Sequence, residues 1–131
     1  MKKKIICIIS MSIALVLLFT IGVSAISWNG YINTYGTSGY AGTETSGEYP
    51  YTVSATLTCR DANGKSVGAD SKTWLNYNAL GERIYSYRVA EVYITATGTI
   101  ATATSTHSVA TATASGTLGT QYTPLILTDT N

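Results

Sequence analysis

The sequence predicts an all-β fold, a small antiparallel two-sheet β-sandwich, on three observations. Residues 51–59 alternate between apolar and polar side chains with a period of two, as in a half-buried strand. After residue 25 the chain holds 21 Thr and 10 Ser, and together with Gly these residues disfavour helix. We expect no crossover helices, so neighbouring strands should be antiparallel, and the apolar face of one sheet should be covered by a second.

The first 25 residues have the pattern of an export signal. Three lysines at residues 2–4 precede an apolar run over residues 5–23, and Val23-Ser24-Ala25 has the small-x-small form of a cleavage site. We therefore expect residues 1–25 to be a signal peptide and the protein to be secreted. The alternative is an uncleaved membrane anchor, because about 18 apolar residues can span a bilayer.

Removal of the signal would leave a single domain over residues 26–131, since 131 − 25 = 106 residues. That domain has 5 basic and 7 acidic side chains, which gives a net charge of 5 − 7 = −2. The length excludes a multidomain enzyme, and the charge excludes a polybasic nucleic-acid binder.

The first part of this domain is rich in Gly, Tyr, Ser and Thr. Over residues 26–50 we expect a short first strand followed by a loop. The alternating strand at residues 51–59 comes next. It should lead into a hairpin loop at residues 61–64, in which Gly64 takes a positive φ.

The return strand of this hairpin should cover residues 65–75. One of its faces should carry Val67, Ala69 and Leu75. Trp74 breaks this parity and predicts a bulge or a change of sheet. A turn over residues 76–82 follows, and residues 83–100 form a long extended stretch. Five apolar residues of that stretch share one parity: Ala90, Val92, Ile94, Ala96 and Ile100.

An almost unbroken alternation of Ala with Thr over residues 101–118 is the most distinctive feature of the sequence. Ser, Thr, His and Ser at residues 105–108 interrupt it, so we expect a turn there and a hairpin on either side. The inward set is expected to be Ala96, Ala101, Ala103, Ala110, Ala112 and Ala114. A last strand is expected at residues 121–127, with Pro124 marking a sheet edge. The total is about six to eight strands.

Short segments resemble immunoglobulin-like domains. Residues 53–59 are similar to strand B of such domains, and Trp74 lies near the place of a core tryptophan on strand C. Residues 90–93 resemble the tyrosine corner, although Thr95 stands where the second cysteine would be. Residues 61–65 are similar to hairpins of bacterial immunoglobulin-like repeats. The resemblance implies an immunoglobulin-like or related sandwich and no particular function.

Cys59 and His107 are the residues best suited to chemistry. Cys59 is the single cysteine after residue 25, so the domain forms no internal disulfide, and its parity with Val53 and Leu57 predicts a buried side chain. His107 falls in the expected turn and should be an exposed polar residue. A Ser–His pair is conceivable, but no acid is near in sequence and no Gly-rich elbow presents a serine.

The remaining titratable residues are scattered, and one cysteine and one histidine are too few for a closed zinc site. The carboxylates are Glu44, Glu48, Asp61, Asp70, Glu82, Glu91 and Asp129. A small sandwich seldom forms a deep cleft between two carboxylates. We therefore expect no enzyme, no catalytic, cofactor-binding or metal-binding residues, and no cofactor.

Aromatic residues are concentrated in residues 26–50 and support two interpretations. They are Trp28, Tyr31, Tyr35, Tyr40 and Tyr49. Flat rings stack on the faces of pyranose sugars, so these residues could form a carbohydrate-binding surface. The interpretation that the sequence favours is structural, with the rings lying across a sheet.

The Ala/Thr stretch has three functional interpretations besides that of an ordinary solvated sheet face, which we favour. Regular Thr rows can match an ice lattice, but no fixed-period repeat is present. A long Ser/Thr hairpin resembles the membrane-inserting strands of small β pore-formers, but Ala and Gly make a poor lipid face. Low charge and small side chains also suit self-association through strand edges.

The function that the sequence predicts is that of a secreted, non-enzymatic interaction protein. The expected partner is an extracellular protein or carbohydrate, and nucleic acid is not expected to bind. The alternative is a bacteriocin-like or toxin-like β protein that acts on membranes or cell envelopes, and membrane contact is expected only in that case.

Overall fold

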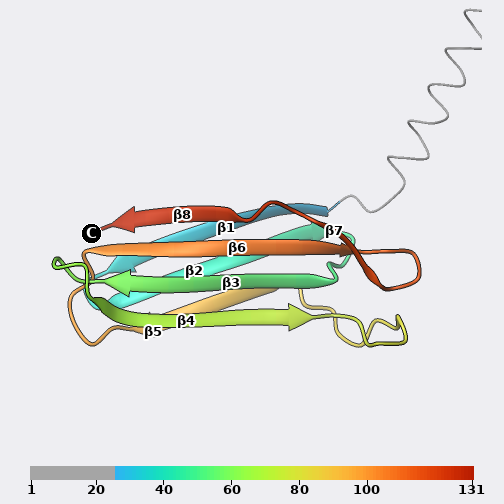
Figure 1. The fold of residues 1–131 in the computed structure, drawn as a ribbon, viewed down its shortest axis with the longest axis horizontal. Helices are drawn as coiled ribbons and strands as arrows, with labels where there is room; N and C mark the ends of the chain where they lie inside the picture. The colour runs from blue at the N-terminus through green and yellow to red at the C-terminus, as the bar shows by residue number, and fades with distance from the viewer. Residues whose placement is uncertain (1–25) are drawn as a thin grey trace, which may run out of the picture.

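The computed structural model describes residues 26–131, and the expected signal peptide lies outside them. Eight strands make up this part of the chain (Figure 1). They are β1 (Ile26–Tyr35), β2 (Ser38–Gly47), β3 (Thr52–Arg60), β4 (Ser66–Leu75), β5 (Val89–Thr95), β6 (Thr102–Ala112), β7 (Leu118–Gln121) and β8 (Leu125–Thr130). The expected all-β class is confirmed. Residues 26–131 contain no helix that is long and apolar enough to cross a membrane.

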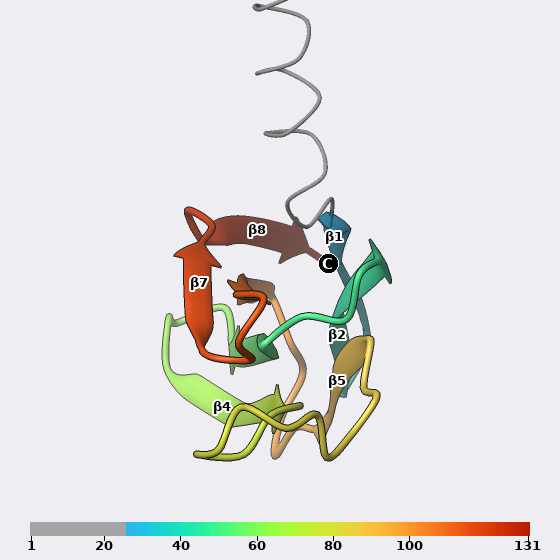
Figure 2. The same cartoon turned by 90° about the vertical axis from the view of Figure 1, so that its right-hand side faces the viewer.

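The strands form two antiparallel sheets. Sheet A has the order β1-β2-β5, and sheet B has the order β4-β3-β6-β7, with β8 also paired to β6. The end-on view shows the two sheets enclosing the core, with β4 beside β5 on one side and β8 beside β1 on the other (Figure 2). Two packed antiparallel layers are the architecture of a small β-sandwich.

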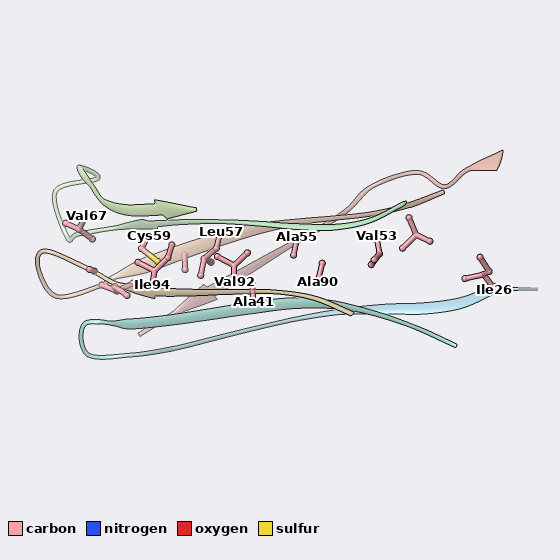
Figure 3. Packing of buried hydrophobic residues seen from close by; sticks show 14 residues of the cluster. Ile26, Ala41, Val53, Ala55, Leu57, Cys59, Val67, Ala90, Val92 and Ile94 are labelled. Carbon is pink, nitrogen blue, oxygen red and sulfur yellow. The ribbon is translucent and has the colours of Figure 1, made fainter. Parts of the chain in front are cut away.

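The core lies between the sheets and is built from alternate residues of facing strands (Figure 3). The inward, buried residues of β3 are Val53, Ala55, Leu57 and Cys59. Those of β5 are Ala90, Val92 and Ile94, and Ala96 and Ile100 beyond the strand are also buried. Both expected alternations are therefore confirmed, as is the burial of Cys59. Burial raises the pKa of the Cys59 thiol, because the thiolate loses its hydration.

Residues 26–50 contain more strand than we expected. In place of a short strand and a loop, β1 and β2 are both 10 residues long, and they are joined by a tight turn in which Gly36 has a φ of 60°. Glycine usually weakens a strand. Here two glycines leave room for rings from neighbouring strands: Gly30 lies against the ring of His107, and Gly42 against the ring of Tyr31.

The expected hairpin between β3 and β4 is present, and Gly64 has a φ of 79°. The change of parity that Trp74 predicted arises at the start of β4, where the register with β3 shifts. Val67 is buried there, whereas Ala69 and Leu75, which we expected on the same face, are exposed. Beyond the shift, Trp74 faces the core side of the sheet and is half-buried.

The long extended stretch expected at residues 83–100 is a strand only over β5. Residues 76–88 form a loop that is held by one fully buried side chain, Asn76. Its Nδ2 donates to the carbonyl oxygens of Pro50 at 2.9 Å and Tyr87 at 2.8 Å. Its Oδ1 accepts from the Tyr87 amide at 2.8 Å. Asn76 therefore ties the start of β5 to the end of the opposite sheet.

The largest correction concerns the Ala/Thr stretch. The turn expected at residues 105–108 and the hairpin around it are absent, because β6 runs unbroken through this segment. It is paired with β3 on one side and with β7 and β8 on the other. The polar residues continue the alternation of the strand, and the buried set is Ala103, Ser105, His107 and Val109. His107 is therefore fully buried, and our prediction of an exposed turn residue is wrong.

Near its end, β6 also departs from the inward alanine set that we expected. The register with β7 shifts between Ala110 and Ala112. Thr111 continues the inward alternation of Ala103, Ser105, His107 and Val109 and is buried, and its Oγ1 accepts from the Thr120 amide at 2.8 Å, while Ala112 is half-buried and Ala114 is exposed. A side chain that finds a hydrogen-bond partner can occupy an inward position without being apolar. Because no turn at residues 105–108 changes the parity, the predicted inward face is wrong from Val109 onward, although Ala110 is buried.

The last strand expected at residues 121–127 is replaced by two strands, β7 and β8, with Pro124 in the connection between them. Proline has no N–H to donate, so it ends one pairing before the next begins. β8 then runs beside β1. There the Asp129 Oδ2 accepts from both the amide and the Oγ1 of Thr34, each at 2.8 Å.

The strand edges of sheet B bear on self-association. β6, the Ala/Thr strand for which self-association was one interpretation, has neighbours on both sides and offers no free edge along most of its length. β4 is an edge strand, and its Asp70 and Lys72 are exposed. Charges on an edge strand oppose pairing with another chain.

Candidate functional site

The outer face of sheet A gathers three tyrosines and a glutamate from three strands. Tyr31 comes from β1, Tyr40 from β2, and Glu91 and Tyr93 from β5. They share the outward parity of their strands, since the alternate positions between them are filled by buried or half-buried residues. Pairing of β2 with β5 places Tyr40 directly opposite Tyr93. We call Tyr31, Tyr40, Glu91 and Tyr93 the tyrosine face.

The Tyr31 ring lies flat across β2. A Cβ at Gly42 would overlap this ring, so the absence of a side chain there lets the ring rest on the glycine backbone. Tyr31 is half-buried. The part of an aromatic ring that stays exposed on a sheet surface can stack against a ligand.

The other two rings extend this surface. Tyr40 is the central ring, with its centroid 5.4 Å from that of Tyr31 and 4.4 Å from that of Tyr93. The ring planes of these two pairs are tilted by 40° and 39°. Tyr93 is 74% exposed, so most of its ring contacts only water. The three rings together form a continuous aromatic strip across the sheet.

Glu91 organises the phenol groups. Its Oε1 accepts from the Tyr40 hydroxyl at 2.7 Å and from the Tyr31 hydroxyl at 2.9 Å. These hydrogen bonds to the carboxylate lower the pKa of Glu91. The pKa of Tyr31 is raised, first by burial and then by its hydrogen bonds, and that of Tyr40 is raised chiefly by its hydrogen bond to Glu91. The face therefore presents neutral phenols around an ionised carboxylate.

A hollow borders the tyrosine face at each end along the strands. The larger has a volume of about 460 Å³, and its polar lining includes Asn29, Glu44 and Arg88. The smaller has a volume of about 210 Å³ and is lined by Asn33, Tyr35 and Tyr93, among others. By the pairing register, Tyr31 and Glu91 lie between the two hollows. The outer face of sheet A thus offers an aromatic strip flanked by two hollows, each lined by both polar and apolar residues.

A second polar cluster lies inside the core around His107. Thr43 Oγ1 donates to the Ser54 carbonyl at 2.7 Å, so its single proton is engaged there. His107 Nδ1, at 2.8 Å, must therefore donate to Thr43 Oγ1. The other ring nitrogen, Nε2, then accepts from Ser105 Oγ at 2.7 Å. This places His107 in the neutral form with its proton on Nδ1.

The Ser105–His107 contact has the distance of a nucleophile and its base. Both residues have no exposed surface, however, and a Cβ at Gly30 would lie 2.5 Å from His107 Cγ. A substrate has no path to the serine in this packing. The cluster satisfies buried polar groups between the sheets, and its role is structural.

The burial of His107 predicts a specific pH dependence of stability. Burial lowers its pKa below the ordinary value of 6.5, because the charged imidazolium would lose its hydration. Between pH 6.5 and the lower folded pKa, the unfolded chain binds one more proton than the folded chain. Stability should therefore fall on acidification through this window, by about 1.4 kcal/mol per pH unit.

Urea denaturation at a series of pH values from about 7 down to about 5 measures this slope, a range in which ordinary carboxylates contribute little. The chain has one histidine, so the slope reports on His107 alone. A His107→Gln variant is the control and should lack the slope. A flat profile for the unaltered protein would contradict the neutral, buried imidazole.

The aromatic residues of residues 26–50 lie in different parts of the structure. Tyr31 and Tyr40 belong to the tyrosine face, and Tyr35, which is 85% exposed, lines its smaller hollow. Trp28 packs against the core and Tyr122, with ring centroids 6.2 Å apart. Tyr49 lies between the guanidinium groups of two arginines, 83 and 88. The interpretation that rings lie across a sheet is therefore confirmed for Tyr31.

Glu91 and Tyr93 were not singled out as site residues. The sequence pattern that could have found them is the alternation along β5. Glu91 and Tyr93 lie between the buried residues of this strand, so their side chains must point outward. Among residues 26–131, no group of three or more His, Cys, Asp or Glu side chains is placed to hold a metal ion.

The segments that resemble immunoglobulin domains are not arranged as the resemblance implied. Residues 53–59 and Trp74 lie on β3 and β4, which are neighbours in one sheet. Strands B and C of an immunoglobulin domain lie in opposite sheets. Tyr93, of the expected tyrosine corner, points to solvent.

Comparison with family models, with curated proteins and with solved structures found no match for this chain. The function therefore has to be inferred from the residues and their geometry. On those grounds the tyrosine face, flanked by its two hollows, is the candidate functional site.

Proposed function

We propose that this protein is a secreted, non-enzymatic module that binds an extracellular carbohydrate through its tyrosine face. The observation that carries the proposal is the strip of three neighbouring rings, Tyr31, Tyr40 and Tyr93, on the outer face of sheet A, with Tyr93 74% exposed. A pyranose ring presents an apolar C–H face and a rim of hydroxyls. The aromatic strip matches the first, and the carboxylate of Glu91 can accept hydrogen bonds from the second.

The shape of the face supports an extended, linear glycan as the ligand. β1 has 10 residues, and at roughly 3.3 Å per residue it is about 30 Å long. The two hollows lie on either side of the aromatic strip along this direction. A chain of several sugar units that follows the strands would contact the strip with its middle and the two hollows with its ends.

The extracellular setting is part of the same proposal. The basic residues 2–4, the apolar run at residues 5–23 and the small-x-small site before residue 26 support export. The single cysteine of the domain, Cys59, is buried. An oxidising medium outside the cell would therefore meet no exposed thiol on the domain.

We also propose that the sandwich is immunoglobulin-like. Pairing of β2 with β5 and of β3 with β6 supports this, since strands B and E, and strands C and F, are neighbours in that fold. In this alignment β3 takes the place of strand C. It does not take the place of strand B, which the sequence resemblance had suggested.

The alternative proposal, a toxin-like β protein that acts on membranes or cell envelopes, has less support from the geometry. The membrane-inserting hairpin considered for residues 101–118 is not formed around residues 105–108, because β6 is a single strand between β3 and the strands β7 and β8. The tyrosine face supports carbohydrate binding, and the experiments below address that function.

Removal of an exposed ring should weaken carbohydrate binding without unfolding the protein. Tyr93→Ala removes a side chain that is 74% exposed and pairs with the ring of Tyr40, and we expect a loss of stability of about 1 kcal/mol. We expect affinity for a bound polysaccharide to fall roughly tenfold, because the stacking contact is lost. Retardation in gels containing soluble polysaccharides, and pull-down on insoluble chitin and cellulose, measure this loss.

The matched control is Thr56→Ala, a change of an exposed residue on the outer face of sheet B. It should bind as the unaltered protein does. If the protein bound none of these polysaccharides, the proposed function would be wrong. If it bound them and Tyr93→Ala made no difference, the site would lie elsewhere.

A further inference from the structure

We propose that Glu91 is the specificity-determining residue of the tyrosine face and selects glycans with free amino sugars, such as glucosamine, over N-acetylated or acidic glycans. This inference rests on the proposed carbohydrate-binding function and adds the class of sugar that is preferred. It follows from the hydrogen bonds of Glu91, from the charges around it and from the rings beside it.

The carboxylate of Glu91 is only partly used by its own protein. Both phenols, of Tyr31 and Tyr40, donate to the same oxygen, Oε1. Within residues 26–131 the second oxygen, Oε2, has no hydrogen-bond partner, and Glu91 is exposed. A carboxylate oxygen has lone pairs for more than one donor. Glu91 therefore has a free acceptor at the edge of the aromatic strip.

The negative charge of Glu91 is also without a cation in the described part of the chain. Its pKa is lowered by the two phenols, and no basic side chain contributes to that shift. The basic residues just before β5 and on the neighbouring β4 are engaged elsewhere. Arg88 stacks on Tyr49 and donates to the Gly47 carbonyl at 2.7 Å, and Lys72 lies over the ring of Trp74. The centre of the face is therefore acidic and uncompensated.

The position of the free oxygen favours a charged donor. Glu91 lies at the hydroxyl ends of Tyr31 and Tyr40, so an ammonium group bound to Oε2 would lie at the edge of the aromatic strip. A hydrogen bond between an ammonium and a carboxylate is stronger than a neutral one. Acetylation of the amine removes its charge. Glu44, on the same face, carries a second negative charge, in a hollow that Arg88 also lines.

Titration calorimetry with three defined oligosaccharides tests this inference. The probes are a glucosamine hexasaccharide, its fully N-acetylated form and an oligogalacturonate, at low ionic strength and mildly acidic pH. We expect the glucosamine form to bind about tenfold more tightly than the N-acetylated form, and the oligogalacturonate to bind most weakly. Added salt should reduce the tenfold ratio, because it screens an exposed charge pair.

Glu91→Gln should bring the affinity ratio of the two glucosamine forms close to one. The substituted amide keeps an oxygen that accepts from both phenols, so the rings should stay in place. Asp70→Asn is the matched control, because it makes the same change in net charge on the exposed edge of sheet B. It should leave the ratio near tenfold.

The possible outcomes separate the two proposals. If none of the oligosaccharides binds, the carbohydrate-binding function itself is wrong. If they bind and lose affinity in Tyr93→Ala, but the glucosamine form has no advantage, only the inference about Glu91 is wrong. The same conclusion follows if the advantage survives in Glu91→Gln.

Discussion

Replacement of Asn76 by aspartate is expected to destabilise the protein by about 3–5 kcal/mol at neutral pH. The Asn76 Nδ2 donates to two carbonyl oxygens, those of Pro50 and Tyr87, inside the protein. An ionised carboxylate in the same place would face these oxygens with no proton to share. It would also lose its hydration, because Asn76 is fully buried.

The pH dependence of this variant gives the prediction a second readout. A buried carboxylate has a raised pKa, so between the unfolded value of about 3.9 and the raised folded value the folded state binds more protons. The stability deficit of Asn76→Asp should therefore shrink as the pH falls through this window. Urea denaturation at several pH values measures it.

Asn63→Asp is the control, because it makes the same chemical change at an exposed position of the β3–β4 loop. We expect it to change the free energy of unfolding by about 0.5 kcal/mol or less. If the two variants were equally stable, Asn76 would not hold the loop at residues 76–88. That loop leads into β5, which carries Glu91 and Tyr93.

His107→Ala is expected to cost about 3–5 kcal/mol, for a different reason. The variant leaves a cavity between β6 and the Gly30 backbone. It also removes the acceptor of the Ser105 hydroxyl and the donor to Thr43 Oγ1, both of which are buried. The loss therefore combines missing packing with unsatisfied polar groups.

Denaturant unfolding of His107→Ala beside Thr104→Ala measures this effect. Thr104 is an exposed residue of the same strand, and its substitution should cost less than about 1 kcal/mol. A small loss in both variants would mean that the His107 cluster contributes little. A large loss in Thr104→Ala alone would mean that the two faces of β6 are exchanged.

The sequence was sufficient where a strand alternates strictly between apolar and polar residues. The inward faces of β3 and β5 could be predicted, because a period of two assigns every second residue to one face without any knowledge of its partners. Prediction failed at β6, where Ser105 and His107 occupy inward positions. Polar residues suggested a turn, yet hydrogen bonds satisfy them inside the core, between Ser105 and His107 within β6 and between His107 and Thr43 of β2.

The candidate site shows the same limit. Tyr31 and Tyr40 stood out in the sequence as aromatic residues, but nothing local joined them to Glu91, which is 51 residues beyond Tyr40. Pairing of β2 with β5 brings these residues together, and the absence of a side chain at Gly42 leaves room for the Tyr31 ring. The β1–β2 hairpin was missed for a related reason, because its glycines are compatible with strands only when neighbouring rings fill the space.

The sequence by itself therefore determined that this protein is an all-β chain, which face of β3 and of β5 is buried, and that Cys59 lies inside. The tertiary structure alone decided the neutral, buried state of His107 and the assembly of the tyrosine face. The physical reason is that alternation along a strand is a local property set by backbone geometry, whereas the partner of a side chain across a sheet or between sheets depends on long-range pairing.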